Sequence, residues 1–481
     1  MSHATRPHHN VTFTLLAVAA VAYALLQSLV APALLEIQHD LDTTTAGVAW
    51  VLTAYLLSAS IATPIAGRFG DMFGKKRTLV VVLVVLAVGT AIAAVATTLP
   101  VMILGRVVQG AGGAVFPLAF SIIRDEFPPE RVPHGIALIS AIMGIGGGLG
   151  IVLAGPIVEH LSYHWLFWFP LVAVAGAAVG TVLFVPESPI RTRGRVDWIG
   201  AALLSAWLIA LLVGVSQGSE WGWASPRVLG LFVAAALLLV LWVAAESRIA
   251  APLVDMRTMR LRGVWTTNLA AFVFGFGMFS SFVLVPELVE LPTNTGFGFG
   301  ASITEAGIYM VPATAAMLLA GPISGHLSQT VGSRVPLVLG AFISSAAFTL
   351  LASAHDAGWE IFLAMFLMGA GIGFAFASMA NLIVEAVPAS QTGVATGMNT
   401  IVRTVGGAIG SQVAGAIVTA TATTAGIPTE RGFTIAFVAA AVALAVGFLV
   451  ALAVPKRRAA IAPEPSGVGR PAVSAATPRM R

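Results

Sequence analysis

The sequence contains no cysteine and little charge, and each shortage excludes a class of protein. Without cysteine there is no disulfide framework, no thiol chemistry and no cysteine metal site. Only 10% of the 481 residues are charged and 58% are hydrophobic, whereas soluble domains carry about 25% charged residues. A chain this apolar needs a solvent as apolar as itself, which a lipid bilayer provides. The composition therefore predicts an integral membrane protein with one membrane domain.

Motifs of cofactor-dependent enzymes are also lacking. The sequence has no phosphate-binding loop and no nucleophile elbow, so ATP-driven transport and hydrolysis have no residues to carry them. His160 and His164 lie beside Glu159, but the order is not His-Glu-x-x-His, and the glycine-rich run at 296–300 has no βαβ unit around it. We therefore expect no enzymatic activity, no cofactor and no metal.

Long apolar runs are what the sequence has in abundance, and each is near the ~20 residues that a helix needs to cross a bilayer. They fall into groups of six, two and six. The runs begin near Val11, Gly47, Thr78, Pro100, Gly135 and Trp165, then near Val196 and Arg227, and then near Val264, Ala306, Pro336, Trp359, Thr392 and Gly432. The pattern predicts an all-α protein with fourteen membrane-spanning helices.

The grouping of these runs predicts five segments. Residues 1–10 form a tail, 11–187 a six-helix bundle, 188–250 two extra helices, 251–455 a second six-helix bundle, and 456–481 a disordered tail rich in Pro, Ala and Ser. Most of the 25 Lys and Arg residues lie in loops that this arrangement places on one side. Because cytoplasmic loops retain positive charge, we expect both termini in the cytoplasm of a multi-pass cell-membrane protein. The formal net charge of +4 then reflects the membrane surface rather than nucleic-acid binding.

The two six-helix groups carry a repeated pattern. Seven residues of the fifth run recur about 260 residues later in the same order. They are Gly146, Gly147, Gly150, Ala154, Gly155, Ile157 and Val158, which recur as Gly406, Gly407, Gly410, Ala414, Gly415, Ile417 and Val418. Parallel repeats of this kind are a known transporter architecture. The sequence thus predicts two bundles of the same orientation, related by a pseudo-two-fold axis.

The loop after the second run reads Gly-Arg-Phe-Gly-Asp-Met-Phe-Gly-Lys-Lys-Arg and has two interpretations. It is either a basic loop that serves topology alone or a gate. In the second interpretation the glycines free the backbone for a tight turn, and Asp71 accepts hydrogen bonds from nearby Arg or Lys, so that the cluster latches one conformation. The residues of this candidate gating loop are Gly67, Asp71, Gly74, Lys75, Lys76 and Arg77.

This loop resembles the signature of the major facilitator superfamily at every defining position. The run that begins Arg106-Val-Val-Gln109-Gly is similar to a second family motif, whose arginine is implicated in proton coupling. The glycines from Gly146 to Gly150, followed by Gly155 and Pro156, resemble the motif of the antiporters in the family. The two extra helices resemble the fourteen-helix drug:proton antiporter branch. The resemblance implies a major facilitator fold and proton-coupled export of small amphipathic compounds, such as drugs or antibiotics, by alternating access.

Two departures from that branch keep other functions open. Tyr23 stands nine residues before Pro32, where the branch usually carries Asp, and Glu159 and His160 follow the antiporter motif in place of small residues. A proton-coupled importer in the same fold is one alternative. A non-transporting receptor or scaffold is another, although the chain offers no sizeable soluble domain. In either transport interpretation we expect a monomer whose partners are a small-molecule substrate, protons and the bilayer.

Ionisable residues within the runs are the candidates for proton coupling. An arginine in the membrane costs several kcal/mol unless it faces a cavity or a partner, so Arg106 and its neighbour Gln109 are either functional or, if the side chain snorkels, interfacial. Asp125 and Glu287 are candidate proton carriers. Glu287 is preferred, with exposure in an outer loop as the alternative, whereas Asp125 lies near the gating loop. Second-rank candidates for a cavity are Glu36, Asn399, Arg403 and Gln412.

The antiporter-motif helix also has a purely structural interpretation. Gly146, Gly150 and Ala154 follow one another at four-residue spacing, which lines one helix face with small groups and lets a neighbouring helix approach closely. Pro156 can bend the same helix beside Gly155. The motif therefore predicts either close packing alone or a centre about which two conformations rock.

Overall fold

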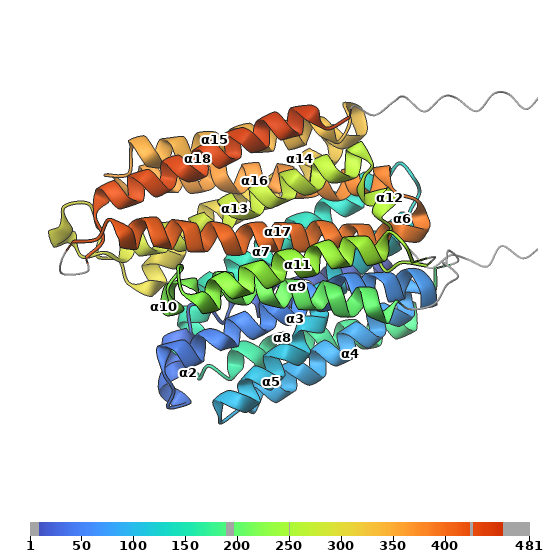
Figure 1. The fold of residues 1–481 in the computed structure, drawn as a ribbon, viewed down its shortest axis with the longest axis horizontal. Helices are drawn as coiled ribbons and strands as arrows, with labels where there is room; N and C mark the ends of the chain where they lie inside the picture. The colour runs from blue at the N-terminus through green and yellow to red at the C-terminus, as the bar shows by residue number, and fades with distance from the viewer. Residues whose placement is uncertain (1–8, 189–196, 250, 424–426, 456–481) are drawn as a thin grey trace, which may run out of the picture.

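The computed structural model describes residues 9–188, 197–249, 251–423 and 427–455, and they form a bundle of long helices whose axes lie roughly parallel to one another (Figure 1). No strand occurs among these residues. The predicted disordered tail at 456–481 and most of the tail at 1–10 lie outside the described residues, while His9 already begins a helix. Fourteen of the described helical segments are long and apolar enough to cross a membrane, which confirms the predicted fold class.

The first half of the chain supplies six of these spans. They are α1 (His9–Ser28), α3 (Thr45–Phe73), α4 (Lys75–Ala94), the composite of α5 (Leu99–Gln109), η1 (Gly110–Ala114) and α6 (Val115–Glu126), α7 (Val132–His160), and α8 (Trp165–Phe184). A short helix, α2 (Leu34–Asp40), connects α1 to α3. Their buried apolar residues form one hydrophobic cluster that extends from Leu16 to Val185.

Two helices separate this half from the next one. They are α9 (Trp198–Ser216) and α11 (Pro226–Glu246), with the short α10 (Gly218–Trp221) between them and α12 (Met256–Met259) after them. The pair packs against the second half and against α3, with a cluster of its own around Leu204 and Leu208. Its outer surface is apolar, since Val240 is 67% exposed, as suits a lipid-facing position.

The second half repeats the six-span plan. Its spans are α13 (Arg262–Glu290), α14 (Ile303–Thr330), α15 (Arg334–Ser353), α16 (Gly358–Ala386), α17 (Thr392–Ala420) and α18 (Glu430–Ala453), with the short turns η2 (Thr293–Thr295) and η3 (Ala389–Gln391) between them. A second hydrophobic cluster extends from Ala270 to Val454.

The repeated glycines pack alike in both halves. Gly146 of α7 lies against Ala24 of α1, while its counterpart Gly406 of α17 lies against the backbone of Phe272 in α13. In each case a side chain on the glycine would overlap the neighbouring helix. Small residues thus allow the fifth helix of each half to press against the first.

The fourth span is not one continuous α-helix, which the sequence did not predict. A five-residue 3₁₀ segment, Gly110–Ala114, interrupts it. A side chain at Gly110 would overlap Ser58, and one at Gly113 would overlap Thr63, both in α3. The glycines thereby allow this span to approach α3 closely, and a mid-helix 3₁₀ segment often marks a strained or functional site.

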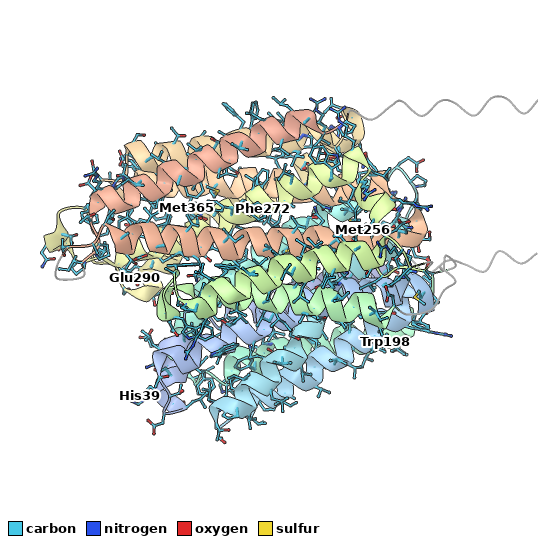
Figure 2. All side chains as sticks on the ribbon, in the orientation of Figure 1. His39, Trp198, Met256, Phe272, Glu290 and Met365 are labelled. Carbon is cyan, nitrogen blue, oxygen red and sulfur yellow. The ribbon has the colours of Figure 1, made fainter. Side chains whose placement is uncertain are left out.

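The two halves meet mainly where α3 packs on α17 and α7 packs on α14, with further contacts between α7 and α16 and between α6 and α17. We call the end of the molecule that holds the α3–α4 turn at Gly74 and the start of α17 the latch face. The opposite end is the far face. Figure 2 marks the latch face with Trp198 and Met256, and the far face with His39 and Glu290.

Candidate functional site: a latch and two buried arginines

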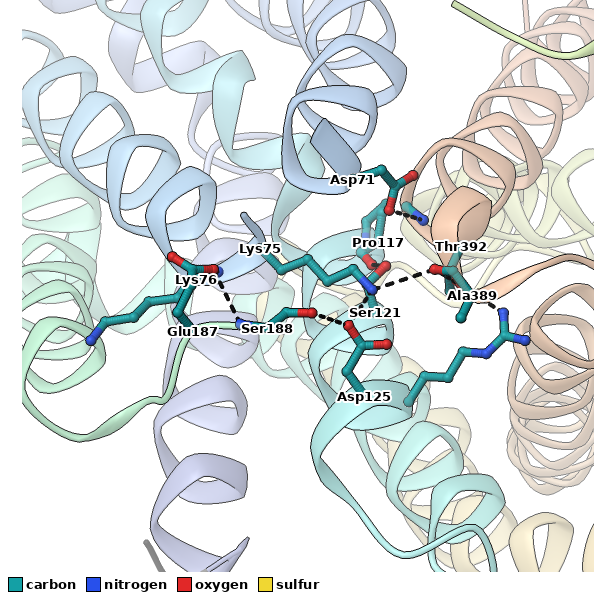
Figure 3. Close-up of polar contacts among 12 residues, drawn as sticks. Asp71, Lys75, Lys76, Pro117, Ser121, Asp125, Glu187, Ser188, Ala389 and Thr392 are labelled. Atoms are coloured by element: carbon teal, nitrogen blue, oxygen red, sulfur yellow. Dashed lines mark hydrogen bonds and ion pairs between the residues drawn. The ribbon is translucent and has the colours of Figure 1, made fainter. Parts of the chain in front are cut away.

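Asp71 of α3 reaches across to the second half at the latch face. The approach is possible because Gly67 and Gly393 touch backbone to backbone: a Cβ on Gly67 would lie 2.6 Å from the Gly393 carbonyl oxygen. Asp71 is 1% exposed and accepts hydrogen bonds from the backbone amides of Gly393 at 3.3 Å and Val394 at 3.2 Å (Figure 3). A carboxylate at a helix N-terminus is stabilised by the free amides and the helix dipole. The donors are therefore the start of α17, not the Arg or Lys side chains that we expected.

Lys75 supplies a second connection. Its ammonium forms an ion pair with Asp125 of α6 at 2.5 Å, and both side chains are fully buried. The Ser188 hydroxyl donates to the same carboxylate, and the Lys75 ammonium also donates to the Ala389 carbonyl oxygen of η3 at 3.5 Å (Figure 3). We call these contacts of Asp71, Lys75 and Asp125, together with those of Arg124 described next, the latch.

Arg124 makes a third connection, which no pattern in the sequence predicts. It donates one hydrogen bond to the Thr392 hydroxyl at 2.6 Å and another to the Val387 carbonyl oxygen at 2.9 Å. Val387 lies in the connection between α16 and α17, and Thr392 is the first residue of α17. Two further hydrogen bonds join the start of α7 and the turn before it to the second half, because Gln329 and Asn381 donate to the carbonyl oxygens of Glu130 and Pro133.

The remaining residues of the gating loop act locally. Gly74 has φ +116, a conformation that favours glycine, and it separates α3 from α4. The Glu187 carboxylate then caps α4, accepting from the backbone amides of Lys76 at 3.2 Å and Arg77 at 3.3 Å. The Arg77 side chain is 72% exposed with its Nε 3.6 Å from Glu187, so the pair contributes little to stability.

The two extra helices are tied to the latch at both ends. Ser188, at the start of the connection to α9, binds Asp125 as described above. After α11, the Thr258 hydroxyl donates to the Gln391 side-chain oxygen at 2.6 Å, and Gln391 donates to Asp255 at 3.4 Å. Gln391 lies one residue before α17 begins. The insertion therefore contacts both sides of the latch.

Arg106 lies inside the first half and is fully buried. Its guanidinium donates to the carbonyl oxygens of Val51 at 3.0 Å and Leu26 at 3.2 Å, and to the Gln109 side-chain oxygen at 2.8 Å. It also stacks on the Tyr55 ring, 4.1 Å from the ring centroid. These contacts exclude the snorkelling alternative. Gln109 is itself oriented by a hydrogen bond to Thr90 at 3.0 Å.

Tyr23, which replaces the expected aspartate, belongs to the same cluster. Its ring centroid lies 6.3 Å from that of Tyr55. Among the described residues no carboxylate lies within salt-bridge distance of Arg106, and one nitrogen of its guanidinium has no hydrogen-bond partner. The site is thus a buried cation that two aromatic rings and two backbone carbonyls accommodate.

Arg403 connects the halves near the middle of α17. It is 9% exposed, and its guanidinium lies 4.4 Å from the centroid of the Phe376 ring and 3.5 Å from the Met143 sulfur of α7. One turn earlier, Asn399 donates to the Asn268 side-chain oxygen at 2.9 Å. Gln412 lies further along the same helix and is half-buried.

The other sequence candidates lie apart from the latch. Glu287 is half-buried near the far end of α13, and Glu36 is exposed in the first turn of α2. On α7, Gly150 faces Ser28 of α1, and Gly155 faces Thr304 of α14 across the halves. Pro156 lies within the continuous helix α7.

Two repeated six-helix halves, which a buried latch joins at one face and two further helices separate in the sequence, define a transport protein of the two-bundle class. The comparison with known families specifies which one. Residues 16–411 and 267–478 match the model of the Major Facilitator Superfamily, and the chain belongs to that family. It is a transporter and not an enzyme.

Several relatives are named for drug resistance or export. The chain is 30% identical over 392 residues to the tetracenomycin C resistance and export protein of Streptomyces glaucescens, covering 79% of this chain and 71% of that protein. It is 27% identical over 332 residues to multidrug resistance protein 3 of Bacillus subtilis (strain 168), covering 68% of this chain but 64% of that protein. These relatives agree with the predicted placement in the fourteen-helix drug-exporter branch.

A solved structure shows the same fold. The human organic anion transporter MFSD10 (TETRAN) superposes with a TM-score of 0.65 at 16% identity, covering 92% of this chain and 98% of that one. At this identity the likeness concerns the fold alone.

Proposed function

We propose that this protein is a proton-coupled antiporter that exports small amphipathic compounds, among them drugs or antibiotics, by alternating access. The observation that carries the proposal is the latch. Asp71, Lys75 and Arg124 of the first half all bind the same short segment, η3 and the start of α17, at one face of the molecule. Among the described residues no hydrogen bond joins the halves at the far face. An arrangement whose halves are held together by hydrogen bonds at one face is what we expect of one of the two states that alternating access requires.

The direction of export follows from the sidedness of the basic loops. The latch face carries Lys75, Lys76 and Arg77, and the positive-inside rule assigns it to the cytoplasm, together with both termini. The latched arrangement is then closed to the cytoplasm. In the proposed cycle a proton from outside neutralises a carboxylate, of which Glu287 near the far face is the candidate, and drives release of the substrate. The names of the relatives support export over import.

Substrate charge follows from the two buried arginines. Arg106 has no carboxylate partner among the described residues, and Tyr23 puts a neutral ring where the drug-exporter branch usually carries an acid. Arg403 adds a second buried cation with aromatic and sulfur neighbours. A binding region near two uncompensated cations disfavours strongly cationic compounds. We therefore propose neutral or anionic substrates.

Proteoliposomes that enclose a pH-sensitive dye test the proposal. An outward-directed proton gradient, with the inside acidic, is imposed, and lipophilic cationic, neutral and anionic drugs are added outside vesicles that contain the wild type or Arg106→Ala. Proton antiport predicts that a neutral or anionic drug dissipates the gradient with the wild type only. If no drug moves protons while the protein accumulates a metabolite, the importer replaces the exporter. Binding without any transport would favour a receptor.

A further inference from the structure

Three potential metal ligands meet at the far face of the second half. His355 lies in the connection between α15 and α16, Asp356 follows it, and Glu430 is the first residue of α18. One ligand atom from each of them lies within 4.8 Å of the others. The His355 side chain is buried, whereas both carboxylates are exposed to solvent. The group therefore combines a fixed imidazole with two adaptable oxygen ligands.

The imidazole is held in the tautomer that a metal needs. The Nδ1 of His355 lies 2.7 Å from the Leu351 carbonyl oxygen, which accepts only, so that Nδ1 carries the proton. Nε2 then presents a lone pair. It is buried without a hydrogen-bond partner, and the nearest carboxylate oxygen, of Glu430, is 3.9 Å away. Metal-binding histidines are typically oriented by such a bond from the second nitrogen to a backbone carbonyl.

The ring is also fixed from the side by Phe437 of α18, whose centroid lies 6.0 Å away in an edge-on arrangement. Two neighbouring charges do not compete for the site. Glu360 accepts the hydrogen bond that caps the start of α16, and the adjacent Arg431 is exposed on α18.

The spacing of the ligand atoms fits a small divalent ion better than a hydrogen bond. A separation of 3.9 Å is too long for a direct hydrogen bond. Two ligand atoms of a tetrahedral zinc, each about 2.0–2.2 Å from the ion, lie about 3.4 Å apart, and the exposed Glu430 side chain is free to move the short remaining distance. Nitrogen and carboxylate ligands suit zinc, and three protein ligands with water in a fourth position complete its coordination.

We propose that His355, Asp356 and Glu430 form a zinc-class divalent-cation site at the far face. A bound ion would fasten the α15–α16 connection to the start of α18, two segments that are about 75 residues apart in sequence. The site is separate from the latch and from both buried arginines.

Isothermal titration of the full-length protein with Zn²⁺ in detergent tests this site. The protein is purified through a histidine-free tag, and His3, His8 and His9 are changed to Ser in every sample, because the amino-terminal histidines offer competing ligands. We expect one saturable site that Glu430→Gln weakens by about tenfold or more. Glu430 is exposed, so this change leaves the fold intact. The control His39→Ala removes an exposed histidine at the same face and is expected to bind like the parent.

A thermal-shift series provides the second readout. Zn²⁺ should raise the unfolding temperature of the parent and of His39→Ala, but not of His355→Gln or Glu430→Gln. Equal zinc binding and equal shifts in the parent and both site variants would overturn the proposal. So would the absence of zinc binding by the parent, in which case His355 and Glu430 form at most a proton-dependent pair.

Discussion

Replacing Asp71 by Asn is the sharpest test of the latch. The wild-type carboxylate is buried and accepts two hydrogen bonds from the start of α17. An asparagine keeps one acceptor oxygen but loses the charge, and its amide group turns a donor toward backbone donors. Hydrogen bonds to charged groups contribute about 1.5–3 kcal/mol each, and the desolvation of the carboxylate offsets part of this. We therefore expect a net weakening of the latched state by about 1–3 kcal/mol, or about 5–150-fold in its population.

Double electron–electron resonance between two spin labels measures the population of the latched state directly. The chain has no cysteine, so single cysteines for spin labels can be added without removing others. Arg131 and Val331 are exposed, lie on opposite halves near the latch face and make no side-chain contact in the latch. Labels there should report one short distance in the parent. In Asp71→Asn we expect a second, longer distance to gain population.

The matched control is Arg77→Gln, which alters the exposed member of the same loop. Its distance distribution should equal that of the parent. An unchanged distribution in Asp71→Asn would contradict the reasoning, since it would mean that the two amide contacts contribute nothing to the choice between states.

The remaining predictions concern packing, paired charges and the buried arginine. Gly67→Val places a side chain against the Gly393 carbonyl, so it should separate α3 from α17 and abolish drug-driven proton movement while Gly176→Val, at an open position, does not. Lys75→Met leaves Asp125 buried without its ion-pair partner and should lower the free energy of unfolding by about 3–5 kcal/mol, measured by denaturant titration. The double variant Lys75→Met/Asp125→Leu should recover most of that loss, and a double variant less stable than the single one would refute the pairing. In Arg106→Lys the planar guanidinium, which binds the Val51 and Leu26 carbonyl oxygens at the same time, is replaced by a single ammonium. We therefore expect transport to fall steeply while the protein is expressed at a normal level. A Lys variant with full activity would show that only the charge matters.

The membrane helices and the family could be predicted from the sequence, because apolar runs and short glycine motifs are local signals. Asp71 was also accessible as a gating residue, but its partners were not. Backbone amides at the start of α17 leave no side-chain pattern, and they lie more than three hundred residues away in sequence. Arg124 and Glu187 were missed for a related reason: one lies in the last turn of α6 and the other in the connection after α8, and only their contacts distinguish them from ordinary charges near the membrane surface.

The fourth span shows a different limit. Its glycines resemble a family motif, and Gly110 and Gly113 also accommodate Ser58 and Thr63 of α3. Close approach between two helices requires small residues on one side and a particular neighbour on the other. The local sequence shows the small residues, but it does not show which helix lies against them.

The attachment of the two extra helices at both ends has a consequence for protein engineering. Glu187 and Ser188 precede the insertion and hold Lys76, Arg77 and Asp125, while Asp255 and Thr258 follow it and hold Gln391. Any attempt to convert this chain into a twelve-helix transporter by excision has to preserve these flanking residues. An excision that begins at the start of α9 and ends at the end of α11 would keep them. An excision that extends into the connections on either side would remove contacts of the latch itself.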